Sequence, residues 1–178
     1  SEATPTTALV KRAENIKSLQ ALLSKENVKS QIALALPKHL TVERVLRIAM
    51  TAIQKTPRLQ DCDGRSILSV IMQSAQLGLV LDGVLGHAYP VPYWNSKTGT
   101  YQAQLQIGYR GFIALAWRSG EIASISAEIV YEKDKFFVEF GTNRHILHIP
   151  AINDEDRGEK KGAYAVVEFK DNHKDFEY

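Results

Sequence analysis

Apolar residues recur at spacings of three and four in the first eighty positions, a pattern typical of amphipathic helices. One such segment follows Thr41, whose side chain suits an N-cap, and another follows Asp63 and stops at Gly78, a natural left-handed C-cap. Two earlier segments place their apolar residues within 16–23 and 28–36. The pattern therefore predicts four helices.

Beyond these helices the period changes to two. Residues 101–107 alternate apolar side chains with three glutamines, which predicts a strand with one polar face. Residues 87–94 are also strand-like, but Pro90 and Pro92 each remove a hydrogen-bond donor, so this strand should be irregular or lie at a sheet edge. Residues 95–99 have hairpin-loop chemistry, and a β-hairpin is expected.

A single helix is expected over 109–119, with Gly120 ending it. Further strands are expected at 122–131, 136–140 and 163–169, with a charged loop over 154–161. The fold class is therefore α+β: N-terminal helices, then a β-hairpin and a sheet with one embedded helix, a β-β-α-β type of core.

Length and composition exclude several classes of protein. With 178 residues, 44% hydrophobic and 24% charged, the chain should bury one core, with or without a helical appendage. No apolar run approaches the roughly 18 residues of a membrane span, and no secretory signal pattern opens the chain. The one cysteine, Cys62, cannot form an intramolecular disulfide. We expect a cytoplasmic protein without membrane contact.

Charge is distributed unevenly along the chain. Residues 1–60 hold ten Lys or Arg against four acidic residues, whereas 61–130 hold four against five and 131–178 hold eight against eleven. An N-terminal basic excess suggests contact with a polyanion, although a solvated helical face gives the same count.

Motifs for cofactor chemistry are absent. The chain has neither a P-loop nor a Gly-x-Gly-x-x-Gly motif, so no nucleotide cofactor is expected. His145 and His148 are three apart in a strand-like segment and should face opposite ways, so neither a metal site nor any cofactor is predicted. A metal-dependent nuclease would require carboxylates such as Glu128, Glu139 and Glu168 to converge, which nothing in their spacing demands.

Two blocks of residues carry a family resemblance. They comprise Gln76-Leu77-Gly78-Leu79 with Asp82-Gly83-Val84-Leu85-Gly86-His87-Ala88-Tyr89, and Gln106-Ile107-Gly108-Tyr109-Arg110-Gly111-Phe112-Ile113 with Arg118-Ser119-Gly120. In order and separation they resemble the RecT family of phage and prophage single-strand annealing proteins, from about residue 30 onward. Departures occur at Leu81-Asp82, where many members have Glu-Pro, and at Trp117, where many have a basic residue. The family typically continues with a basic helical segment, so the chain is expected to match its N-terminal and central parts.

The resemblance implies a function. It implies ATP-independent binding of single-stranded DNA, annealing of complementary strands through a duplex intermediate, assembly into rings or helical filaments, and cooperation with a phage exonuclease in the bacterial host cytoplasm. No covalent chemistry is expected, since pairing is downhill by roughly 1.4 kcal/mol per stacked step. The alternatives are a passive single-strand protector, a metal-dependent nuclease and a phage structural protein.

Candidate DNA contacts begin on the 109–119 helix. Arg110 and Arg118 lie two turns apart, roughly 12 Å along the axis, and could address phosphates of one strand. Trp117 could stack on a base or pack under the hairpin. Gln104 and Gln106 belong to a polar row that either binds DNA or is merely solvated.

Other cations could line a groove. Lys97 lies near the hairpin tip, and Lys133, Lys135 and Arg144 border the later strands. By helix and strand parity, Tyr89 and Tyr109 are expected in the core rather than as stacking platforms. Two regions are proposed: residues 1–60, helical, basic and used for oligomerisation, and residues 61–178, the central DNA-binding core.

Overall fold

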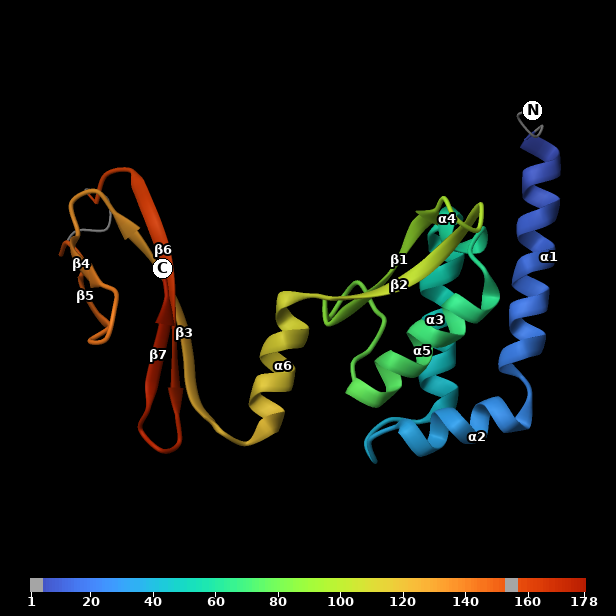
Figure 1. Ribbon diagram of the computed structural model, residues 1–178, viewed down its shortest axis with the longest axis horizontal. Coiled ribbons are helices and arrows are strands. Elements are labelled where there is room, and N and C mark those ends of the chain that lie inside the picture. Colours follow the sequence, from blue (N-terminus) through green and yellow to red (C-terminus); the bar gives the residue numbers. More distant parts are fainter. Residues whose placement is uncertain (1–4, 153–156) are drawn as a thin grey trace. The chain divides into compact units, whose positions relative to one another are not determined.

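The computed structural model describes residues 5–152 and 157–178. Its elements, in chain order, are α1 (Pro5–Leu23), α2 (Glu26–Ala35), α3 (Val42–Lys55), α4 (Pro57–Gln60), α5 (Gly64–Leu77), β1 (Ala88–Asn95), β2 (Thr100–Ile107), α6 (Tyr109–Ser119), β3 (Ile122–Tyr131), β4 (Lys135–Glu139), β5 (His145–Ile149), β6 (Lys160–Phe169) and β7 (Lys174–Glu177) (Figure 1). The chain divides into two compact units, Ser1–Leu115 and Ala116–Tyr178, which we call the first and second units. The boundary lies within α6. The α+β class is confirmed.

Capping explains where the helices of the first unit begin and end. The Thr41 hydroxyl accepts a hydrogen bond from the Arg44 N–H at 3.4 Å, and the Asp63 carboxylate accepts one from the Ser66 N–H at 3.2 Å. Helix α5 ends at Gly78, whose φ of 60° is the left-handed conformation that favours glycine. These three boundaries are as the sequence predicts.

The core of the first unit joins the helices to one face of the hairpin. Strands β1 and β2 lie over α5 and contact it (Figure 1). Buried side chains come from before residue 60, such as Leu19 and Leu59, and from after it, such as Ile71 and Ala103. The helices on both sides of residue 60 share this core, and the compact units separate near residue 115.

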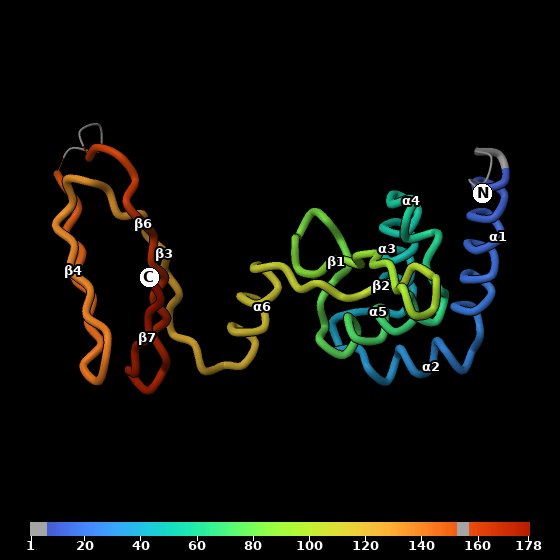
Figure 2. Tube along the Cα trace, turned by 45° about the horizontal axis from the view of Figure 1, so that its top comes forward, coloured from blue at the N-terminus to red at the C-terminus, as the bar shows by residue number. Residues whose placement is uncertain are grey.

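The second unit consists largely of β-structure. Strands β3, β6 and β7 form an antiparallel sheet in the order β3-β6-β7 (Figure 2). Strand β4 pairs with β5 in a separate two-stranded sheet. The described strands thus form three separate sheets, β1–β2, β3-β6-β7 and β4–β5. Elements α4, β5 and β7 were not predicted.

Strand β6 begins earlier than expected. Lys160 opposes Tyr131, so Lys160 and Lys161 belong to the strand and not to a charged loop. Residues 154–156 of that expected loop lie outside the described residues. None of the described helices is both long and apolar enough to cross a membrane.

Candidate nucleic-acid interface

The register of the hairpin sorts its side chains onto two faces. Strands β1 and β2 pair antiparallel over eight positions, from Ala88 opposite Ile107 to Asn95 opposite Thr100. Directly opposed residues project from the same side of a ribbon. Ala88 and Ala103 are buried against the helices, so alternate positions of both strands must face outward.

The outward side is aromatic, amide-rich and uncharged. We call it the tyrosine–glutamine face; it consists of Tyr89, Val91 and Tyr93 opposite Gln106, Gln104 and Gln102 respectively. Gln106 Nε2 donates to the Tyr93 hydroxyl at 3.2 Å, and Asn95 Nδ2 donates to Gln102 Oε1 at 3.1 Å. Tyr89 and Tyr93 remain 40% and 41% exposed. This face offers aromatic rings and amide groups to a ligand without any carboxylate.

The expectation that Tyr89 packs in the core is therefore wrong. Its parity with Tyr93 along β1 was visible in the sequence, but the face that carries both tyrosines points away from the helices. Alternation along a strand assigns residues to two faces, and only packing on α5 decides which face is buried. Tyr89 and Tyr93 are candidate contacts that the sequence reasoning did not select.

Close backbone contact places α6 at the end of this face. The Gly108 N–H donates to the His87 carbonyl at 2.9 Å, just before α6 begins. A Cβ at Gly111 would lie 2.9 Å from Ile107 Cγ2 and 3.0 Å from the His87 carbonyl carbon, inside normal contact distance. Gly108 and Gly111 therefore allow the backbone at the start of α6 to approach the His87 backbone closely.

Arg110 projects from the first turn of α6. Its Nε donates to the Tyr109 hydroxyl at 3.0 Å, and its guanidinium lies 5.7 Å from the centre of the Tyr109 ring. The hydrogen bond to Tyr109 raises the pKa of Arg110, so this exposed group stays cationic. At the opposite end of the hairpin, the Asn95 side chain accepts from the Lys97 N–H at 3.0 Å, and Lys97 is exposed. One cation therefore lies at each end of the hairpin.

The buried face of α6 differs from the expected one. Tyr109 and Phe112 are 69% and 60% exposed, whereas Gly111 is buried and Ala114 and Leu115 pack against the core. Tyr109 is therefore a surface residue, contrary to the sequence expectation. The reason is the glycine contact: the side of the helix without a side chain at Gly111 approaches the His87 backbone most closely.

The remaining candidates belong to the second unit. Trp117 is 48% exposed, and Arg118, Lys133 and Lys135 are exposed. Arg144 is held by ion pairs to Asp175 at 2.8 Å and Glu177 at 3.7 Å and lies over the Phe176 ring. Of the candidates chosen from the sequence, the structure thus brings Gln104, Gln106 and Arg110 together in the first unit. Arg144 instead interacts with Asp175, Phe176 and Glu177 of its own unit.

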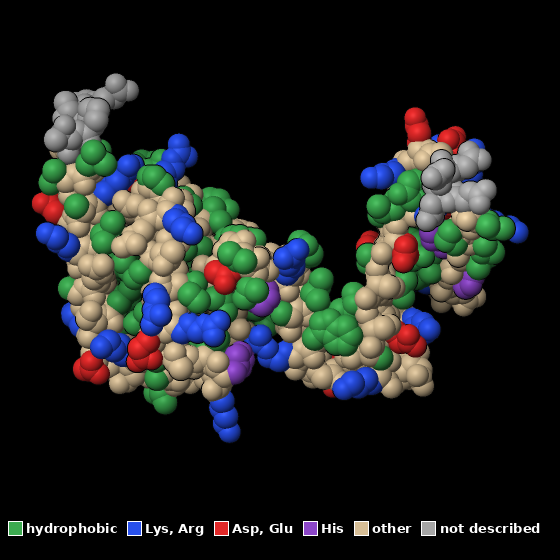
Figure 3. Space-filling model, turned by 180° about the vertical axis from the view of Figure 1, so that it is seen from behind, with side chains coloured by type: hydrophobic (Ala, Val, Ile, Leu, Met, Phe, Trp, Pro, Cys, Tyr) green, Lys and Arg blue, Asp and Glu red, His purple; other side chains and the backbone are tan. Residues whose placement is uncertain are grey.

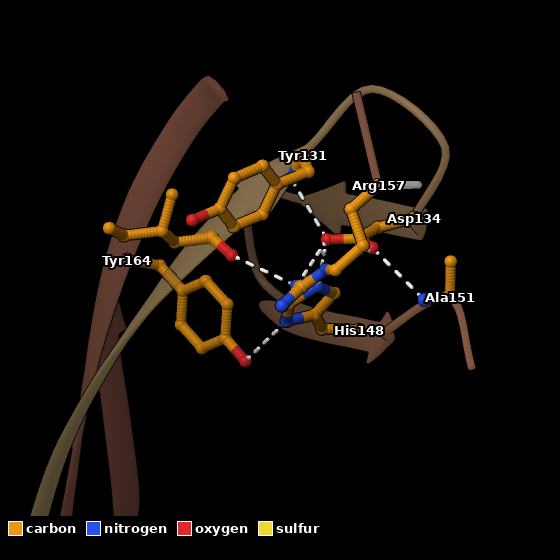
Figure 4. A network of polar contacts seen from close by, with 7 residues as sticks. Tyr131, Asp134, His148, Ala151, Arg157 and Tyr164 are labelled. Atoms are coloured by element: carbon orange, nitrogen blue, oxygen red, sulfur yellow. Dashed lines mark hydrogen bonds and ion pairs between the residues drawn. The ribbon is translucent and has the colours of Figure 1, made fainter. Parts of the chain in front are cut away.

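A buried polar network, not foreseen from the sequence, organises the second unit (Figure 4). The Asp134 carboxylate accepts from Arg157 Nε at 2.9 Å and from the Ala151 N–H at 3.0 Å, and lies 3.0 Å from His148 Nε2. His148 Nδ1 is 3.1 Å from the Tyr164 hydroxyl. Hydrogen bonds from Arg157, and then from Ala151 and His148, hold the pKa of Asp134 far below its usual range.

The two histidines of β5 have different surroundings. His145 is exposed while His148 is buried in the network, so the two face opposite ways, as the sequence predicts. No sequence signal marked the network, because Asp134, His148 and Arg157 are brought together only by the fold of the strands. In the described part of the chain, no three His, Cys, Asp or Glu side chains are grouped to hold a metal ion.

Comparison with known proteins places the chain in a family. The model described as the RecT family matches residues 43–178. The chain belongs to the RecT family. It is 45% identical over 159 residues to Protein RecT of Escherichia coli strain K12, an alignment that covers 88% of this chain and 58% of that protein.

A second relative matches a smaller part of the chain. The RecT-family chain is 40% identical over 74 residues to the uncharacterized protein YqaK of Bacillus subtilis strain 168, which covers 42% of this chain and 24% of YqaK. The chain thus spans 58% of the length of RecT and a quarter of that of YqaK. Residues 43–178, which match the family model, include the hairpin and α6 and therefore the tyrosine–glutamine face of this chain.

Proposed function

We propose that this RecT-family chain binds single-stranded DNA on the tyrosine–glutamine face and promotes annealing of complementary strands without ATP. The observation that carries the proposal is the outward face of the hairpin, which is aromatic and uncharged and has Lys97 and Arg110 at its two ends. Family membership supports it, since annealing is the activity that the resemblance implies.

The chemistry of the face suits a strand of any sequence. Every base has a π-face, so stacking on Tyr89 and Tyr93 is tolerant of sequence and contributes roughly 1–3 kcal/mol per base. The glutamine amides both donate and accept hydrogen bonds, so they fit phosphate oxygens as well as base edges. No carboxylate repels phosphate on this face, and Arg110 remains charged at its end.

Other basic surface contributes long-range attraction. Lys and Arg side chains are numerous on the face of the first unit shown in Figure 3, and acidic ones are few there. The 1–60 segment carries ten basic against four acidic residues. Such an excess attracts polynucleotide and raises the rate of encounter.

The second unit supplies the remaining proposed contacts. In this proposal Trp117 and Arg118, on the last turn of α6, and Lys133 and Lys135, at or just before the start of β4, are DNA contacts made by the second unit. Arg144 is the least suited of the candidates, because Asp175 and Glu177 already neutralise it.

Annealing of complementary strands is limited by its rate rather than by its free energy. Pairing is downhill, so the protein need only screen phosphate repulsion and leave base edges accessible, and neither covalent chemistry nor ATP is required. We propose that the chain acts in the bacterial cytoplasm as a ring or helical filament, with residues 1–60 in the contact between copies, and alongside a phage exonuclease.

A strand-pairing assay tests the proposal. Two complementary oligonucleotides, one with a fluorophore and one with a quencher, should pair faster with the protein present, and acceleration should decline as salt is raised. A passive protector would slow pairing, and a nuclease would shorten end-labelled DNA in magnesium. Absence of DNA binding at low ionic strength would refute the proposal.

A further inference from the structure

The β3-β6-β7 sheet of the second unit has two chemically different faces. On one face, Tyr164 of β6 stacks with Phe136 of β4 at 5.9 Å between ring centres, and Phe176 of β7 lies 6.2 Å from Phe140. The β4–β5 hairpin therefore covers this face. His148 of this hairpin and Asp134, in the turn directly before β4, belong to the buried network (Figure 4).

The opposite face has no such cover among the described residues. On β3 and β6 it presents three opposed pairs, Ile125 with Val167, Ala127 with Ala165, and Ile129 with Ala163, and we call these six positions the alanine-rich sheet face. On β7 the same side continues with Glu177 and Asp175, which oppose Ala165 and Val167. The two central alanines are exposed and Ile129 is 40% exposed. A sheet face that meets water usually alternates to polar residues, whereas this one is apolar at all six positions.

The shape of this face favours a helix as its occupant. The short alanine side chains at its centre project little from the sheet. Beside β7 the face forms a depression of about 200 Å³ bordered by Asp175 and Glu177. Strand β3 has ten residues and is roughly 33 Å long. Helix α1, with nineteen residues, is roughly 28 Å long and so matches it.

Charge and exposure point to α1 in particular. Leu9 and Val10 of α1 are 64% and 55% exposed, and Lys11 and Lys17 are exposed on the same helix. Arg144 pairs with Asp175 at 2.8 Å and more loosely with Glu177 at 3.7 Å, and the side chain of Glu177 is 89% exposed. Two copies of the same sheet face would bring like charges together, so face-to-face pairing of the sheets is disfavoured.

We infer that the alanine-rich sheet face of one copy receives helix α1 of a second copy, so that copies assemble head to tail. The segment 1–60 has six more basic than acidic residues, ten against four, and 131–178 has three more acidic than basic, eleven against eight. When α1 of one copy binds the sheet face of another, the pair still has one free α1 and one free sheet face. Further copies can therefore add at both ends, which produces an open filament, or a ring if the ends meet. The inference rests on the assembly part of the proposed function and supplies its second surface.

Two variants, each defective in one surface, test the inference in sedimentation velocity of the full chain without DNA. Ala165→Arg places a cation and bulk on the sheet face, and Val10→Asp places a charge on α1. The wild type should associate as concentration rises, and each variant should associate at least ten times more weakly. Ala123→Arg, an exposed alanine at the irregular start of β3 and outside the face, is the matched control and should associate like the wild type.

Mixing the two defective variants provides the decisive measurement. Ala165→Arg retains α1 and Val10→Asp retains the sheet face, so an equimolar mixture should form a one-to-one complex at concentrations where each variant alone stays monomeric. A monomeric wild type, a mixture that does not associate, or normal association of Val10→Asp would each overturn the inference. Because DNA is absent, failure here is distinguishable from failure of annealing, which the strand-pairing assay measures.

Discussion

The contact of α6 with the loop before β1 can be tested by adding one methyl group. In Gly111→Ala the new Cβ would lie 2.9 Å from Ile107 Cγ2 and 3.0 Å from the His87 carbonyl carbon, and closer still to the carbonyl oxygen. Carbon atoms in contact normally lie about 3.5–4.0 Å apart, so backbone or side chain must move by roughly 0.5–1 Å. Such overpacking costs about 1–3 kcal/mol.

Part of that cost is offset. Replacing glycine within a helix by alanine favours the helix by about 1 kcal/mol, so the net loss in free energy of unfolding should be about 0–2 kcal/mol, with the upper half expected because backbone is the obstacle. For a chain of this size each 1 kcal/mol lowers Tm by roughly 2–4 °C. Displacement of the first turn of α6 also moves Arg110, so annealing should slow.

Thermal unfolding by circular dichroism and the strand-pairing assay measure both effects. Gly64→Ala is the control, because Gly64 opens α5 and a Cβ there would meet nothing within 4 Å. This control should be as stable as the wild type or more so, with unchanged annealing. If Gly111→Ala matched the control in Tm and annealing, the close approach of α6 to His87 would not position Arg110 as argued.

Three further predictions concern the two units. Arg110→Ala should weaken binding to all sequences alike and reduce the salt slope by about 0.7, measured by fluorescence anisotropy across salt. Arg58→Ala, at an exposed position of α4, removes a cation outside the tyrosine–glutamine face and should change both quantities less; equal slopes in the two variants would contradict a phosphate contact at Arg110. Tyr93→Ala should weaken binding of single-stranded DNA roughly 5- to 150-fold, as expected for the loss of about 1–3 kcal/mol of stacking. Tyr93→Phe retains the ring and should bind DNA nearly normally. Equal losses of affinity in both variants would argue against stacking. Because the pKa of Asp134 is depressed in the folded protein, the stability that this carboxylate contributes is present above pH about 4 and declines as the pH falls below that value. Asp134→Asn should therefore be less stable at pH 7, and its Tm should vary less than that of the wild type between pH 7 and pH 2. An identical pH profile of Tm in both proteins would contradict the network.

The resemblance and the caps made the first unit largely predictable. Thr41, Asp63 and Gly78 mark helix ends through local hydrogen bonds and local φ, which depend on a few neighbouring residues. The hairpin was similarly visible from the alternation of residues 101–107 and from the turn residues between the strands. Local signals of this kind survive without knowledge of the tertiary fold.

The candidate site was only partly predictable. Gln104, Gln106 and Arg110 were selected as candidates, but Tyr89 and Tyr109 were assigned to the core and are exposed. The amphipathic pattern of α6 predicted burial of the face that carries Tyr109, but the buried face is the one that carries Gly111. The reason is that Gly111 lets the helix approach the His87 backbone closely, and this contact leaves Tyr109 and Phe112 exposed. Similarly, the network around Asp134 joins residues 14 to 23 positions apart, a separation that carries no periodic signal.

Sequence by itself determined the α+β class, most helix boundaries, the hairpin and the family, since each depends on local hydrogen bonding, short-range periodicity or a run of matching residues. Tertiary structure alone decided which face of the hairpin is buried, that the strands form three separate sheets, and that one sheet face in the second unit is apolar and open among the described residues. The physical reason is that periodicity defines the faces of an element, whereas burial depends on which distant surface packs against each face.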